Sequence, residues 1–229
     1  GSLVAIVAGT KADKVIEHIR KIDYKKRSCV KEITLDMANS MKLISKRCFP
    51  KATQVTDRFH VQKLALEALQ EIRIKHQWEA MDFENQLILQ AKRENQTYIP
   101  ELLANGDSVK QLLARSRYVL YKSREKWTEN QNERAQFLFG LYPDIKTAYY
   151  LSQQLRGIYN SNNDKHIAMT KLAHWYRNVE ESGFKNFNIL LNTITFNYRS
   201  ILNYFDNRST NASAESFNAK IKAFRSQFR

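Results

Sequence analysis

The stretch TLDMANSMKLISKRCFPKATQVTDRFHVQK, residues 34–63, decides how the chain is expected to fold and where its chemistry is expected to lie. Two acidic residues in it, Asp36 and Asp57, each follow a short run rich in β-branched residues, which is typical of a strand. A helical pattern follows each acid. A carboxylate at the end of a strand is fixed in place and stays open to a metal ion or a substrate. Two such ends predict half of a metal-dependent phosphoryl-transfer site.

The patterns around this stretch predict alternating strands and helices over residues 3–60. Apolar or β-branched runs predict strands at residues 3–8, 30–35 and 53–56. Apolar residues at helical spacing predict a helix from Ala12 to Ile19 and a short helix around Met41–Ile44, and YKKRS (24–28) is expected to be a basic loop. Strands that alternate with helices pair in parallel, so we expect an α/β sheet covered on both faces.

Beyond residue 59 the strand signals almost vanish and helical patterns dominate. A long helix is expected over 59–95, because no Pro or Gly occurs there and apolar residues recur on one face. Further helices are expected at residues 107–121, 128–139, 143–159, 163–182 and 184–204. Trp78, Trp127 and Trp175 fall within helical apolar patterns, so we expect them in the core rather than as platforms for base stacking.

A last helix is predicted to begin near Thr210–Asn211, with an apolar and a polar stripe side by side. The apolar stripe consists of Ala214, Phe217, Ile221, Phe224 and Phe228, and the polar stripe consists of Asn211, Glu215, Asn218 and Lys222. We expect the apolar stripe to be docked on the rest of the protein. Glu215 would then stand in the first turns of a fixed helix, which is a suitable place for a third carboxylate.

The charge balance favours a nucleic-acid partner. The chain carries 37 Lys and Arg against 23 Asp and Glu, a formal net charge of +14, and the basic residues are spread along it. A basic surface on a folded protein most often neutralises phosphates. A basic protein with no such partner remains the alternative.

Several other classes of protein lose support. Cys29 and Cys48 lack the spacing of a zinc site or a disulfide framework. Nucleotide-binding loops, the Rossmann glycine pattern, the hydrolase elbow and the zinc-protease helix motif do not occur. There is also no signal peptide and no apolar run long enough to span a bilayer, so we expect a cytoplasmic protein.

Two site residues have structural alternatives. An acid after a strand is often only a helix N-cap, and Asp36 before residues 37–39 could serve that purpose. His60 lies three residues after Asp57. It either supports or joins the acidic cluster, or it packs beneath the sheet.

Four blocks of the sequence resemble the DDE transposases of bacterial insertion sequences, specifically the ISL-three branch. The blocks are EITLDMANS (32–40), FPKATQVTDRFHVQKL (49–64), PDIKTAYYLSQQLRGIY (143–159) and ILNYFDNRSTNASAESFNAKIK (201–222). The strings DRFH and TNxxxExxNxxIK within them are the most specific.

The resemblance implies a ribonuclease-H-like sheet interrupted by a helical insertion, and DNA cleavage and strand transfer with two Mg²⁺ (or Mn²⁺) ions. The implied division places the core at 3–60 and 209–229 and the all-helical insertion at 61–208. Asp36 matches the second acid of the family's catalytic triad and Glu215 the third, and both would bind metal. The other implied site residues are Asp57 as runner-up for the second acid, Asp57, His60, Asn211 and Asn218 as support, and Arg58, Lys220, Lys222 and Arg225 as contacts to double-stranded DNA. A homo-oligomer assembled on DNA is implied as well.

The chain departs from the family pattern at the first acid. That Asp should lie on a strand before LVAIVAG (3–9), where only Gly1 and Ser2 stand, and Asp13 and Asp23 fall in the following helical region. We therefore expect a partial core without its first strands and weak or no cleavage by residues 1–229 alone. A ribonuclease-H-like nuclease or resolvase, and a non-catalytic DNA-binding helical module in which Asp36 is a cap, are the alternatives.

Overall fold

The computed structural model describes residues 5–7, 9, 11–161 and 164–227, and the chain divides into two compact units. The first unit contains Gly1–Val61, Asn162–Lys171 and Leu191–Arg229, and the second contains Gln62–Ser161 and Leu172–Leu190. Three helices pass from one unit to the other, so each unit is built from segments distant in sequence. The predicted division into a core at 3–60 and 209–229 and an insertion at 61–208 follows different boundaries and stays a prediction.

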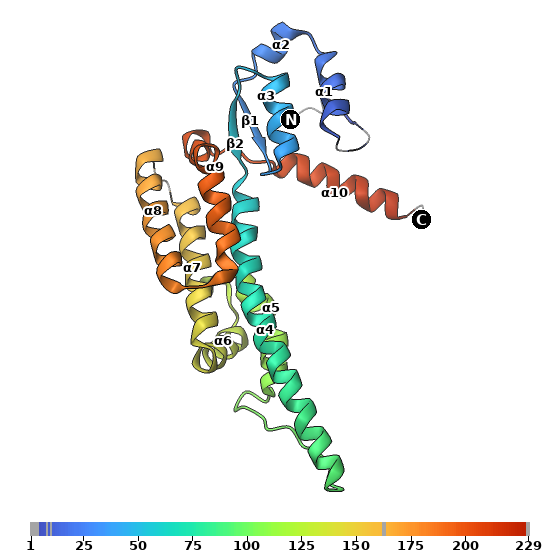
Figure 1. The fold of residues 1–229 in the computed structure, drawn as a ribbon, viewed down its shortest axis with the longest axis vertical. Helices are drawn as coiled ribbons and strands as arrows, with labels where there is room; N and C mark the ends of the chain where they lie inside the picture. The colour runs from blue at the N-terminus through green and yellow to red at the C-terminus, as the bar shows by residue number, and fades with distance from the viewer. Residues whose placement is uncertain (1–4, 8, 10, 162–163, 228–229) are drawn as a thin grey trace. The chain divides into compact units, whose positions relative to one another are not determined.

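The first unit holds a small parallel sheet with helices around it (Figure 1). Its complete elements are α1 (Ala12–Arg20), α2 (Tyr24–Ser28), β1 (Glu32–Leu35), α3 (Asn39–Cys48), β2 (Thr53–Thr56) and α10 (Ala212–Ser226). The start of α4 (Arg58–Arg93), the start of α8 (Lys165–Ser182) and the end of α9 (Asn188–Asn207) complete it. The predicted strand at 53–56 is therefore confirmed, and the predicted parallel pairing of the second and third strands is confirmed as well.

Two predictions for the first thirty residues are wrong. Ala5–Val7 form no strand, although a strand was expected over 3–8; the other residues of that run lie outside the described part of the chain. YKKRS is a short helix, α2, rather than a loop. The side chain of Asp23 caps it by accepting a hydrogen bond from the backbone N–H of Lys25 at 2.6 Å, so the signal for this helix lay in the preceding acid.

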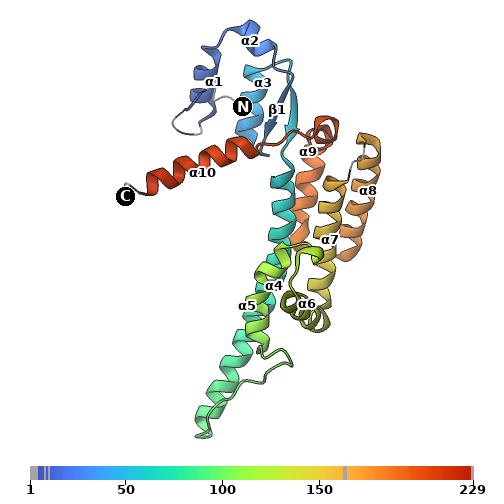
Figure 2. The same ribbon diagram turned by 180° about the vertical axis from the view of Figure 1, so that it is seen from behind.

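The small core of the first unit forms where α1 packs on α3 (Figures 1 and 2). Ile16, Ile44 and Cys48 are buried there, and partly buried apolar residues of both helices surround them. Arg27 locks α2 onto this core, because its guanidinium donates to the backbone oxygens of Ile22 at 2.9 Å and Cys48 at 2.6 Å. These contacts fix the position of α3, the helix that connects β1 to β2 in the chain.

Polar side chains of α9 attach that helix to the sheet. The hydroxyls of Ser200 and Thr56 are 2.8 Å apart, and the Asn203 amide donates to the backbone oxygen of Gln54 at 3.0 Å. One turn further on, the Asn207 amide donates to the Glu32 carboxylate at 2.9 Å. The sheet is thereby fixed to a segment about 150 residues away in the chain.

The described part of the chain contains one sheet of two strands, and the rest of the regular structure is helical. An α-rich α/β fold is therefore correct. The ribonuclease-H-like core remains a prediction. No helix in the described ranges is long and apolar enough to cross a membrane.

The second unit is all-helical. It contains most of α4, then α5 (Val109–Tyr121), α6 (Glu129–Leu141), α7 (Pro143–Asn160), most of α8 and the start of α9, with two short 3₁₀ segments, Arg124–Lys126 and Lys185–Phe187. Trp175 is buried, and its indole N–H donates to the backbone oxygen of Leu151 at 2.8 Å, as expected for a core residue. Trp78 was expected in the core as well but is 60% exposed, because the second half of α4 has one face without a covering helix in this unit.

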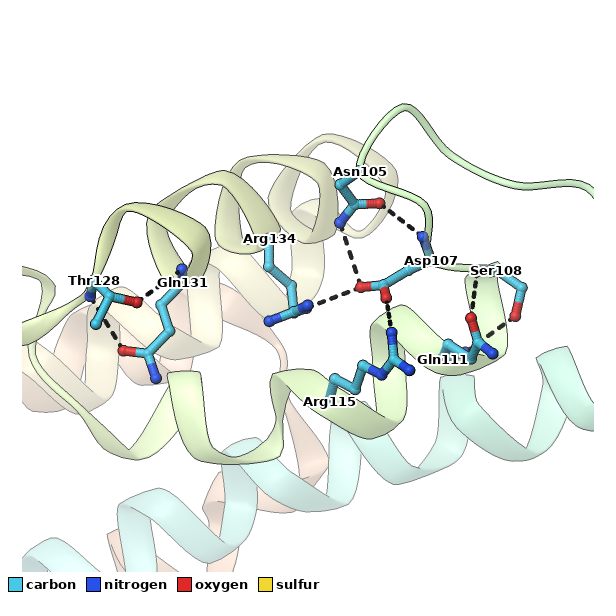
Figure 3. Close-up of polar contacts among 8 residues, drawn as sticks. All are labelled: Asn105, Asp107, Ser108, Gln111, Arg115, Thr128, Gln131 and Arg134. Atoms are coloured by element: carbon cyan, nitrogen blue, oxygen red, sulfur yellow. Dashed lines mark hydrogen bonds and ion pairs between the residues drawn. The ribbon is translucent and has the colours of Figure 1, made fainter.

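Capping residues set where α5 and α6 begin (Figure 3). Ser108 accepts from the backbone N–H of Gln111, whose side chain accepts from the backbone N–H of Ser108 in return. Thr128 and Gln131 repeat this reciprocal arrangement at the start of α6. Such capping boxes satisfy backbone donors that no helical hydrogen bond can reach.

Asp107 ties these two helices together (Figure 3). Its carboxylate is 1% exposed and forms ion pairs with Arg115 of α5 and with Arg134 of α6, the latter at 2.9 Å. Asn105 adds a hydrogen bond from its side-chain amide at 3.3 Å. Burial by itself would raise the pKa of Asp107, but the hydrogen bonds from Arg134 and Arg115 outweigh it, so the pKa lies below its usual value.

Replacing Asp107 with asparagine is expected to lower the free energy of unfolding by about 2 kcal/mol at pH 7, because charge-assisted bonds to two partly exposed arginines are lost. Because the folded-state pKa is depressed, the carboxylate stabilises the protein above its unfolded-state pKa of 3.8 and loses that effect as the pH falls below it. Urea unfolding should show a larger difference between the native protein and the variant at pH 7 than at pH 3. The exposed Glu101→Gln serves as control, and an equal loss at both pH values would contradict the ion-pair argument.

Candidate active site

The two strand-end acids lie at one edge of the sheet. In the parallel register Leu35 pairs with Thr56, and the backbone N–H of Asp57 donates to the oxygen of Leu35 at 3.0 Å. Asp36 and Asp57 directly follow this last pair. The carboxyl ends of both strands therefore present an acid at the same edge.

Asp57 is buried and uses both carboxylate oxygens on backbone donors. The side chain is 2% exposed. Oδ1 accepts from the N–H of Phe59 at 2.9 Å at the start of α4, and Oδ2 accepts from the N–H of Asn211 at 2.8 Å. A buried carboxylate is tolerated only when such bonds replace its hydration. Asp57 thus joins the start of α4 to the residue just before α10.

Asp36 is half-buried and keeps one oxygen open. Its Oδ1 accepts from the backbone N–H of Ala38 at 3.0 Å, the bond of an Asx turn. The helix α3 begins at Asn39 with Ala38 at its N-cap and no side-chain cap, so Asp36 shapes the turn before the helix without being its N-cap. Among the described residues, no hydrogen bond reaches Oδ2.

Glu215 stands in the first turn of α10 and pairs with His60. The Nε2 of His60 lies 3.3 Å from Oε1 of Glu215, and the two side chains are 28% and 42% exposed. The ring of His60 also meets that of Phe59 edge-on, with centroids 5.8 Å apart. His60 therefore faces the last helix, and the alternative in which it packs beneath the sheet does not describe it.

The hydrogen bond between Asp57 and Asn211 brings the sequence-distant members of the site together. It holds the N-terminal end of α10 at the carboxyl edge of the strands, as both views of the ribbon show (Figures 1 and 2). Asp36 is placed at that edge by the strand register and Glu215 by the anchoring of its helix. Within the described ranges, however, no three Asp, Glu, His or Cys side chains form a group that could hold a metal ion.

The outer part of α10 differs from what its sequence pattern predicts. None of its described residues is buried, and Phe217 and Phe224 are 38% and 62% exposed, so the expected docking of the apolar stripe is wrong for this structure; Phe228 lies outside the described residues. An amphipathic pattern predicts which face can be covered, and it does not specify the covering surface. The helix also carries predicted site residues that are exposed, namely Asn218, Lys220, Lys222 and Arg225.

Sequence reasoning assigned no role to Ser200, Asn203 and Asn207, although they fix α9 to the strands that carry the acids. Their spacing, three and four residues apart, places them on one face of a helix. Polar residues at that spacing in an otherwise apolar segment were the signal that could have identified them.

The family model for ISL3-type DDE transposases, described as "Transposase", matches residues 1–229. The chain belongs to this family. No curated protein and no solved structure matches the transposase significantly. The resemblance of the four sequence blocks is thus confirmed, and with it the function of the chain in DNA transposition.

The edge of the sheet where Asp36 and Asp57 follow the two strands (the acidic edge) has donor chemistry that fits the divalent metal ions generally used by this family. Asp36 and Glu215 offer hard carboxylate oxygens, and Mg²⁺ is commonly bound by one or two carboxylates together with water and substrate phosphates. Asp57 fits less well, because both of its oxygens already accept backbone hydrogen bonds.

Proposed function

We propose that Asp36 and Glu215 are the metal-binding carboxylates with which this transposase cleaves DNA and transfers strands, and that Asp57 and His60 position them. The observation that supports this most is the bond from the Asn211 N–H to Asp57, which holds the helix of Glu215 at the strand edge that carries Asp36. Two Mg²⁺ (or Mn²⁺) ions, when bound, would supply Lewis acidity for in-line attack on a phosphodiester.

In this proposal each residue of the edge has a separate task. Asp36 would offer its open oxygen to a metal ion, while its other oxygen holds the turn. His60 restricts the carboxylate of Glu215 to one orientation through its 3.3 Å contact. Asp57 is a positioning residue, since it reaches the reaction only through the backbone it anchors. Asn211 contributes its N–H to that anchor.

The basic residues of the last helix are proposed to hold duplex DNA next to this edge. Lys220, Lys222 and Arg225 are exposed on α10 and can neutralise backbone phosphates, with Arg58 contributing from the start of α4. Asn218 stands one turn after Glu215, where its amide can contact the same DNA duplex. Two or more copies of the transposase are proposed to assemble on the DNA ends.

The function is tested with the full-length protein, Mg²⁺ and a duplex carrying a pre-cleaved element end. We expect a strand-transfer product in which the 3′-hydroxyl of the element end is joined to a target duplex. Cleavage without joining would favour the nuclease or resolvase alternative. Residues 1–229 alone are expected to cleave weakly, because Asp36 and Glu215 match only two of the three acids that the family resemblance implies. Robust turnover by residues 1–229 would contradict that expectation.

A further inference from the structure

A hollow of about 490 Å³ opens in the first unit between α3, β2 and the second half of α9. It reaches the start of β2 at Thr53 and Gln54, whereas the acidic edge lies beyond the end of that strand. Its volume is within the range of pockets that hold small organic ligands. The residues that give it its chemistry are Lys42, Phe196, Asn197, Tyr198, Arg199 and Asn203.

Two cations line the hollow without an acidic partner. Neither Lys42 nor Arg199 forms an ion pair in the part of the chain that the structure describes. Lys42 is half-buried, and this burial lowers the pKa of its ammonium group. The Gln54 amide donates to the backbone oxygen of Lys42 at 3.2 Å, so the lysine is held on a fixed wall. An anion beside Lys42 would restore the stabilisation that its ammonium group loses on leaving water.

Aromatic rings stand beside these cations. Phe196 is 74% exposed and Tyr198 is 42% exposed. The ammonium group of Lys42 lies 4.4 Å from the centroid of the Phe196 ring, a cation–π contact that orients the ring. A single exposed phenylalanine is ordinary, but one that is held by a cation at the mouth of a hollow is a surface on which a flat ring can stack.

An unsatisfied polar atom adds an independent indication of a ligand. Asn197 is 5% exposed, and its amide N–H donates to the backbone oxygen of Thr193 at 2.7 Å. Its Oδ1 has no hydrogen-bond partner among the described residues. Buried acceptors are nearly always paired in folded proteins, so this unpaired acceptor is an exception on a residue that lines the hollow.

We propose that this hollow binds an unpaired nucleotide of a DNA single strand. The base stacks on Phe196 and the adjoining phosphates lie against Lys42 and Arg199. Surfaces that hold single strands combine cations that follow the backbone with aromatic side chains that stack on bases. In a duplex the faces of the bases are covered by their neighbours, so the ring can select only unpaired DNA. The site does not use the acidic edge and goes beyond the function proposed above.

The test is fluorescence anisotropy with labelled oligo(dT) and with a labelled duplex, both in EDTA so that binding is measured without cleavage. Phe196→Ala is expected to weaken the binding of oligo(dT) about tenfold and to change duplex binding less than about twofold. Phe196→Leu should lose as much affinity for oligo(dT), because leucine keeps the apolar volume without the ring. Phe196→Trp should retain its affinity for oligo(dT). Lys42→Gln should weaken the binding of oligo(dT). The number of phosphate contacts calculated from the salt dependence of this binding should fall by about one.

Phe83→Ala is the matched control, since Phe83 is a helical phenylalanine that is 64% exposed in the second unit. It should leave the binding of both DNAs unchanged. The proposal would be overturned if Phe196→Leu bound oligo(dT) with full affinity, or if Phe196→Ala lost as much affinity for the duplex as for oligo(dT). Circular dichroism of each variant establishes that the helices are intact. A failed strand-transfer assay would leave this binding difference untouched, so the two proposals fail separately.

Discussion

Replacing Asp36 with asparagine is expected to slow DNA cleavage and strand transfer by the full-length transposase about a thousandfold. Loss of a metal-binding carboxylate removes several kcal/mol of transition-state stabilisation, and each 1.4 kcal/mol corresponds to a factor of ten in rate. Asparagine retains an Oδ1 acceptor for the Ala38 N–H, so the turn after β1 should persist. Single-turnover cleavage of a labelled element end measures the rate, and anisotropy with the same duplex measures binding.

The comparison with other variants determines what a loss of activity means. Glu215→Ala should cause a similar loss, while Asp13→Ala, which removes a carboxylate that is 93% exposed, should cause none. DNA affinity is expected to stay within about threefold of the native value in all three, because the proposed phosphate contacts are cations elsewhere. Full activity of both Asp36→Asn and Glu215→Ala would instead identify a non-catalytic DNA-binding module.

Replacing Asp57 with alanine is expected to cost about 3 kcal/mol of stability in the first unit. The change removes two charge-assisted hydrogen bonds and leaves the backbone N–H groups of Phe59 and Asn211 without their acceptor. The start of α10 should also detach, so trypsin should cut after Arg208 sooner than in the native protein. Urea unfolding and timed proteolysis measure the two effects.

Two further variants separate the anchoring role of Asp57 from metal binding. Asp57→Asn keeps one acceptor but turns an amide N–H toward the other backbone donor, so an intermediate loss of stability is expected. Asp82→Ala, an exposed acid on α4, should change neither stability nor proteolysis. If Asp57→Ala were fully stable yet inactive with Mg²⁺, Asp57 would be a metal ligand.

The sequence predicted the elements whose signals are local. The strand at 53–56 and the helix around Met41–Ile44 were found because their apolar spacing and their stops lie within a few residues of each other. The apolar run at 3–8 gave a false strand, since a strand also needs a partner to complete its hydrogen bonds, and local sequence does not specify one. The prediction that the apolar stripe of α10 is docked was wrong for a similar reason, because the sequence of a helix does not specify the surface that covers it.

The candidate site was predictable as a set of residue types but not as a set of roles. Asp36 and Asp57 look alike in sequence, each an acid after a β-branched run. Their difference comes from the donors around them: one N–H on Asp36, and two on Asp57, of which one belongs to a residue 154 positions away. The pairing of His60 with Glu215 depends on that same distant contact.

Asp57 and Asn211 are 154 residues apart in the chain, and this separation has a consequence for the synthesis of the transposase. A ribosome adds about 5–20 residues per second, so on the order of 10–30 s pass between the synthesis of Asp57 and that of Asn211. During that interval the nascent chain has neither Glu215 nor the anchor that sets its helix in place. A half-made polypeptide thus lacks the edge at which we propose that DNA is cut, because this edge forms only after Asn211 and Glu215 have been synthesised.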